Sequence, residues 1–172
     1  LIHESYYNIY GFKPLIQRGK NKEAVKNAVL LEPENHDVLY WSSKFYAAIG
    51  NAKKAAPLIE KAILIAPFGS DERKAFLCRV YLGSFDFEKA EETAKELIIL
   101  GDKRSVFVGS MFMAFIEAKT NRLSKAKETF QGILDSEQMT KQQAIAQFRK
   151  YFSDRDPYYS FEFYNVLESL KK

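Results

Sequence analysis

Cysteine, histidine, glycine and proline are all scarce in this chain of 172 residues. Its only cysteine is Cys78, so an internal disulfide is excluded. Its two histidines, His3 and His36, form no metal-ligand motif with each other or with Cys78. Eight glycines and five prolines leave few breakers, which favours helices over a turn-rich sheet. No apolar run reaches about 18 residues, so we expect no membrane insertion of this segment.

Motifs for catalysis are also missing. The chain contains neither of the glycine-rich motifs that bind phosphate groups, G-x-x-x-x-G-K-[ST] and G-x-G-x-x-G. It also lacks the H-E-x-x-H motif of zinc proteases. Glu91 and Glu92 fall on a charged helix face, and the spacing of Glu91 and Lys95 fits a surface ion pair. We expect His36 to be solvent-exposed and Cys78 to be buried and unreactive. The sequence therefore predicts a protein that is not an enzyme and holds no cofactor or metal.

The net charge of +4 and the pI of about 9.0 come from basic residues scattered among acidic ones. Nucleic-acid binding needs basic residues concentrated on one surface, so this scatter argues against it. The chain starts at Leu1 with a helix-like segment already under way. We therefore expect a piece of a longer protein, and we expect a cytoplasmic location.

Three segments of the chain align without gaps. They span residues 51–68, 86–103 and 122–138. Each has a small residue followed by apolar residues at the spacing of an amphipathic helix, with Lys and Glu on its other faces. The small residues Ala55, Ala90 and Ala126 are 35 and then 36 residues apart.

A second helical segment precedes each of these. The leading segments span about 37–49, 71–83 and 105–119, and short polar turns follow them. Asn51 and Asp86 suit the N-caps of the second helices, and Gly50 suits a helix C-terminus. No pair can bury its apolar stripe alone, so the pairs must stack. The pattern predicts an all-α fold, an α-solenoid of antiparallel helix pairs.

This pattern resembles the tetratricopeptide repeat, which has a small residue and an aromatic in helix A, Ala opening helix B, and Pro closing it. The first full copy carries Ser43, Tyr46, Ala55, Ile59, Ala62 and Pro67. The second carries Cys78, Tyr81, Ala90, Ala94 and Leu97, with Asp102 where Pro is usual. The third carries Ala114, Ala126, Phe130 and Ile133, with Glu117 in place of the aromatic.

We expect one domain over residues 1–172. Its parts are a degraded repeat at 1–34, which ends in Ala28 and Pro33, then repeats at 36–67, 70–102 and 105–137, and capping helices at 140–172. The cap is predicted as one helix over 140–152 and another over 158–170.

The tail is similar to the C-terminus of repeat domains in bacterial signalling proteins, including adenylyl cyclases and winged-helix transcription activators. The matching residues are Phe152, Asp156, Pro157, Leu167, Leu170, Lys171 and Lys172. This resemblance implies a regulatory or sensor domain attached to an effector domain, with a possible homodimer.

The tetratricopeptide resemblance implies that helix A lines a concave groove that binds a peptide or partner protein. The positions carried over are Asp37, Tyr40, Lys44, Glu72, Ala75, Arg79, Met111, Phe115 and Lys119. Aromatic, Met, Lys and Arg side chains would suit an extended peptide with an acidic or carboxylate group. The alternative is that several of these residues only pack between repeats.

Overall fold

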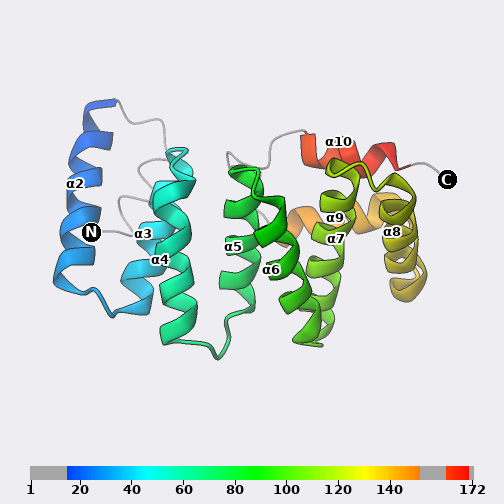
Figure 1. Ribbon diagram of the computed structural model, residues 1–172, viewed down its shortest axis with the longest axis horizontal. Coiled ribbons are helices and arrows are strands. Elements are labelled where there is room, and N and C mark those ends of the chain that lie inside the picture. The colour runs from blue at the N-terminus through cyan, green and yellow to red at the C-terminus, as the bar shows by residue number, and fades with distance from the viewer. Residues whose placement is uncertain (1–14, 152–161, 171–172) are drawn as a thin grey trace. The chain divides into compact units, whose positions relative to one another are not determined.

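The computed structural model describes residues 15–151 and 162–170, and all of their secondary structure is α-helical (Figure 1). The helices are α2 (Leu15–Leu31), α3 (His36–Ala48), α4 (Ala52–Ile65), α5 (Asp71–Gly83), α6 (Phe87–Ile99), α7 (Lys103–Lys119), α8 (Leu123–Glu137), α9 (Lys141–Tyr151) and α10 (Glu162–Ser169). Within each part of the chain, helices adjacent in sequence pack on one another, as α3 does on α4 and α6 on α7, which confirms the predicted helical-repeat fold of the solenoid class.

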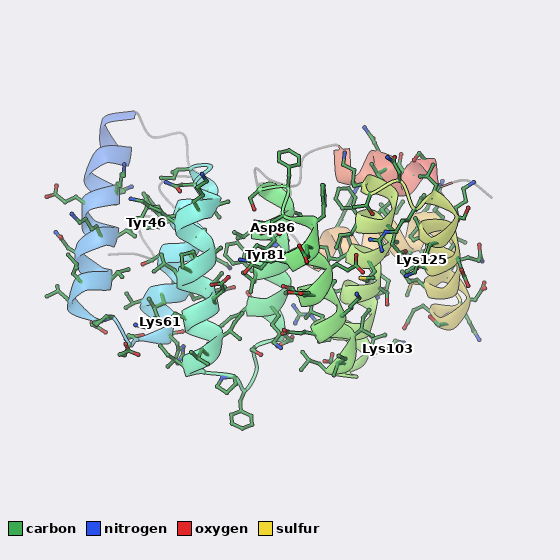
Figure 2. All side chains as sticks on the ribbon, viewed as in Figure 1. Tyr46, Lys61, Tyr81, Asp86, Lys103 and Lys125 are labelled. Carbon is green, nitrogen blue, oxygen red and sulfur yellow. The ribbon has the colours of Figure 1, made fainter. Side chains whose placement is uncertain are left out.

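The chain divides into two compact units, Leu1–Arg73 and Lys74–Lys172, and the division falls inside α5. In the first unit α3 packs against α2 and α4. The core of this unit is formed by apolar side chains that are no more than 1% exposed, namely Val25, Leu39, Phe45, Ala55, Ile59 and Ala62. Lys61 of α4 pairs with Glu34 of the α2–α3 loop at 2.6 Å (Figure 2).

In the second unit α7 packs against α6, α8 and α10. The Cys78 thiol of α5 donates a hydrogen bond to the Ala90 carbonyl of α6 at 3.4 Å. From α9, the ring of Phe148 meets Phe112 of α7 edge to face, with centroids 5.4 Å apart. Both rings are fully buried. The last helices therefore add to the same apolar core as the repeats.

One turn geometry joins each of the three helix pairs. The backbone N–H of the residue that opens the second helix donates to a carbonyl five positions earlier. These bonds are Asn51 to Tyr46 (2.8 Å), Asp86 to Tyr81 (3.0 Å) and Arg122 to Glu117 (2.8 Å). The residue before each donor has a positive φ: 78° at Gly50, 60° at Phe85 and 61° at Asn121. These are the left-handed helix ends of Schellman type, and they recur at the 35- and 36-residue spacing of the sequence repeat.

Side-chain caps start the helices at the predicted places. Asn35 accepts hydrogen bonds from the backbone of α3, Asn51 from Lys54 and Asp86 from Lys89. Asp102, where the repeat pattern has Pro, accepts a 2.9 Å bond from the Ser105 N–H. A hydrogen bond from the Ser105 side chain, together with this backbone bond, lowers the pKa of the Asp102 carboxyl. The capped helix α7 starts at Lys103, two residues before the predicted start.

Small residues at helix crossings are buried as expected. Ala55, Ala90 and Ala126 are 0% exposed. Gly109 of α7 allows the closest approach, because a Cβ added there would lie 2.8 Å from the Ala94 carbonyl oxygen of α6. The repeat alignment had placed the small residue of this helix at Ala114, which is also fully buried.

Both predicted capping helices are present. They are α9, predicted over 140–152, and α10, predicted over 158–170, of which residues 158–161 lie outside the described residues. Ala144, Phe148 and Leu167 are 0% exposed, and Leu170 is 6% exposed. Phe152 lies outside the described residues.

Candidate partner-binding surface

Three of the predicted groove residues, Tyr40, Lys44 and Glu72, are in direct contact in the first unit. The Tyr40 hydroxyl donates to Glu72 Oε1 at 2.7 Å, and Lys44 Nζ lies 3.7 Å from the same oxygen. The ammonium of Lys44 also lies 4.5 Å from the ring centroid of Tyr40 and 5.1 Å from that of Trp41. These four residues form what we call the α3 cluster.

The positive charge of Lys44 in the α3 cluster is already paired with the negative charge of Glu72. Lys44 is largely covered, with 14% of its side chain exposed, whereas 62% of the Glu72 side chain is exposed. A cation over two aromatic faces is stabilised by their negative quadrupoles, and Glu72 neutralises it further. A ligand carboxylate would therefore compete with Glu72 for Lys44. Of the two rings, that of Tyr40 is buried and that of Trp41 half-buried, and their planes are tilted by 55°.

Arg73 joins α5 to α3 and to the preceding loop. Its guanidinium donates to the Ala66 carbonyl at 2.9 Å and contacts His36 Nδ1 at 3.1 Å. The same ring nitrogen is 3.1 Å from an Asp37 carboxylate oxygen. The side chains of His36 and Asp37 are 39% and 67% exposed, so the predicted exposure of His36 holds. His3 lies outside the described residues.

The predicted groove residues of the second unit differ in exposure. Met111 is 0% and Phe115 7% exposed, and this supports the packing alternative for both. Arg79 is half-buried, with its guanidinium carbon 5.2 Å from the Phe76 ring centroid. Ala75 and Lys119 are also half-buried.

Glu117 is a buried charge whose partners the sequence did not predict. Only 1% of its side chain is exposed, its Oε1 lies 3.4 Å from Lys125 Nζ, and its Oε2 accepts a 2.7 Å hydrogen bond from Thr129. In the two earlier pairs the equivalent contact is a lysine over a tyrosine ring: Lys54 over Tyr46 at 5.5 Å and Lys89 over Tyr81 at 5.4 Å. Figure 2 labels Tyr46, Tyr81 and Lys125 of this series.

The contact between Glu117 and Lys125 therefore replaces a cation–π contact by an ion pair at the same place in the repeat. The signal was present in the sequence, since glutamate stands at an aromatic position and a lysine follows eight residues later in all three pairs.

Glu91 is held ionised by two cations. Its carboxylate accepts a 2.6 Å bond from Arg122, between α7 and α8, and lies 2.8 Å from Lys95. These contacts, that of Arg122 first, lower the pKa of Glu91 from 4.5 to about 2. The predicted pair of Glu91 and Lys95 is confirmed, and Arg122 extends it to a second helix pair.

The Cys78 thiol is fully buried, as expected, and burial raises its pKa. A thiol kept protonated in this way is a poor nucleophile. Among residues 15–151 and 162–170, no three His, Cys, Asp or Glu side chains gather where they could hold a metal ion. Within the same ranges no helix is long and apolar enough to cross a bilayer.

No protein-family model matches the chain, and no curated protein is significantly similar to it. Of the tail residues that resemble bacterial signalling proteins, Leu167 and Leu170 are described, and the others lie outside the described residues.

Proposed function

We propose that this chain is a tetratricopeptide-type module that binds an extended peptide or a segment of a partner protein at a surface that includes the α3 cluster. The observation that carries the proposal is the α3 cluster, in which the predicted groove residues Tyr40, Lys44 and Glu72 are in direct contact and the Glu72 side chain is 62% exposed. The repeated turn geometry at 35- and 36-residue spacing supports the repeat assignment.

The α3 cluster suits a ligand that carries an apolar group and a carboxylate. Aromatic side chains give contact area at low entropic cost. Because Lys44 already lies between the rings and Glu72, a ligand carboxylate can replace Glu72 as its partner without moving the ammonium. The exposed Glu72 side chain is the group that would swing away.

Selection of peptides tests this function. A displayed random-peptide library is panned against the whole chain, and the affinity of recovered acidic peptides is compared for wild type and Lys44→Gln. We expect Lys44→Gln to lower the affinity for these peptides by about tenfold, which is the effect of losing one charge-assisted contact. The matched control is Lys53→Gln, which removes the same charge from an exposed residue of α4.

Equal weakening by Lys53→Gln would show attraction by net charge alone and would contradict a site at Lys44. Failure to enrich any peptide would contradict the binding function itself. Glu72→Gln adds a further criterion, because removal of the competing carboxylate should raise the affinity for acidic peptides.

A further inference from the structure

The turn between α5 and α6 holds an exposed aromatic side chain on a left-handed backbone. Phe85 has a φ of 60°, and 74% of the residue is exposed. Its ring meets the edge of Phe87, a neighbour on the same turn, with centroids 6.3 Å apart and planes at 71°. Phe85 therefore contributes little to the apolar core of its unit.

The fold does not need phenylalanine at this position. The same turn position is Gly50 in the first pair and Asn121 in the third, and both have a positive φ. Glycine and asparagine adopt that conformation readily, whereas a bulky residue is strained there. Phe85 thus combines a backbone penalty with exposed apolar area, and neither stabilises the hairpin.

Two exposed carboxylates follow this turn on α6, among the exposed lysines Lys89 and Lys95. Glu88 and Glu92 are exposed and lie four residues apart, on one side of α6. The equivalent positions carry Lys53 and Pro57 in the first pair, and Ser124 and Glu128 in the third. At these three positions, an exposed aromatic followed by two exposed carboxylates occurs only in the second of the three pairs.

We propose that Phe85, with the carboxylates of Glu88 and Glu92, docks a basic partner protein that presents an apolar face edged by Lys or Arg. A strained residue that the local fold does not require is a mark of function. A large aromatic is the usual anchor of a protein interface. The negatively charged carboxylates favour a partner surface of positive charge through charge complementarity. This surface is separate from the α3 cluster, and the inference does not depend on the proposed peptide binding.

The probe is a fluorescein-labelled synthetic helix with leucine on one face and lysine on the other, and its binding to the whole chain is followed by fluorescence anisotropy. We expect Phe85→Asn to weaken binding by about tenfold or more. We expect Glu88→Gln combined with Glu92→Gln to weaken it and to reduce its dependence on salt. Phe68→Asn is the matched control, because Phe68 is another exposed phenylalanine, 94% exposed, in the α4–α5 loop.

Thermal melting decides between docking and a structural role. Phe85→Asn and Phe85→Gly relieve the backbone strain, so we expect Tm to rise by about 2–4 °C while binding falls. A lower Tm in both variants would assign the ring to the fold and overturn the proposal. So would failure of the wild type to bind the probe, or equal loss of binding in Phe68→Asn.

Discussion

At the scale of single residues, Gly109 and Gly132, two glycines inside helices, have opposite surroundings. A Cβ at Gly109 would lie 2.8 Å from the Ala94 carbonyl oxygen and 2.8 Å from the Ile98 side chain, both on α6. The backbone oxygen cannot move without displacing the helix. A Cβ at Gly132 of α8 would meet nothing within 4 Å. The two positions therefore form a matched pair for testing the contact of α6 with α7.

We predict that Gly109→Ala destabilises the protein by about 1–3 kcal/mol, the usual cost of overpacking. Gly132→Ala should stabilise it by about 0.5–1 kcal/mol, because alanine loses less backbone entropy in a helix. Chemical denaturation of both variants gives the two free energies of unfolding. Equal effects at the two positions would contradict the close approach of α6 and α7.

At the scale of elements, the ionised Glu91 ties α6 to the turn between α7 and α8 through Arg122. Its folded pKa of about 2 is below the ordinary value of 4.5. Between these values the unfolded chain binds more protons than the folded one. The stabilisation from Glu91 is therefore complete above about pH 4.5 and is lost as the pH falls through 2.

We predict that Glu91→Gln costs about 1–2 kcal/mol at pH 7, a value reduced for the partial exposure of Arg122. The difference between wild type and variant should shrink steadily as the pH is lowered from 4.5 towards 2. Urea denaturation over this pH range measures it. Glu128→Gln, at an exposed residue of α8, is the control and should change stability by less than about 0.5 kcal/mol. A difference that stays constant with pH would contradict the assigned contacts.

The helix pairs were predictable because their signals are local. Asn51 and Asp86 cap helices within three residues of themselves, and the alanines repeat at the period of the fold. The exposure of a groove residue depends instead on elements distant in sequence. Met111 shares the predicted groove face with Lys119, yet it is fully buried, and Lys44 is paired with a glutamate of another helix.

Departures from the repeat pattern could also be seen in the sequence, but their structural consequences could not. Glu117 at an aromatic position marks a difference between pairs, but its contacts with Thr129 and Lys125 require the packing of α8 on α7. Likewise the sequence places Phe85 in a turn. Only the backbone shows that it shares a left-handed position with Gly50 and Asn121.

At the scale of the whole molecule, a chain of helices that pack mainly on their neighbours is stabilised by local interfaces, and its end elements are held from fewer sides. The last described helix is α10, Glu162–Ser169. It packs on α7 and α9 through side chains that include the fully buried Leu167. Lys141, the first residue of α9, donates hydrogen bonds to the carbonyls of Glu168 and Leu170 at the C-terminal end of α10.

This arrangement predicts local rather than global loss of order when α10 is weakened. Leu167→Ala removes a fully buried side chain, and such a truncation costs about 2–5 kcal/mol. The lost packing energy stabilises only the interfaces at the C-terminal end of the stacked helices. Hydrogen exchange should therefore accelerate in α9 and α10, while the amides of α3 and α6 keep their protection. Val166→Ala, at a half-buried neighbour, should change exchange much less. Equal acceleration across all helices would mean that the chain unfolds as one cooperative body, and stability would then not be a sum of neighbouring interfaces.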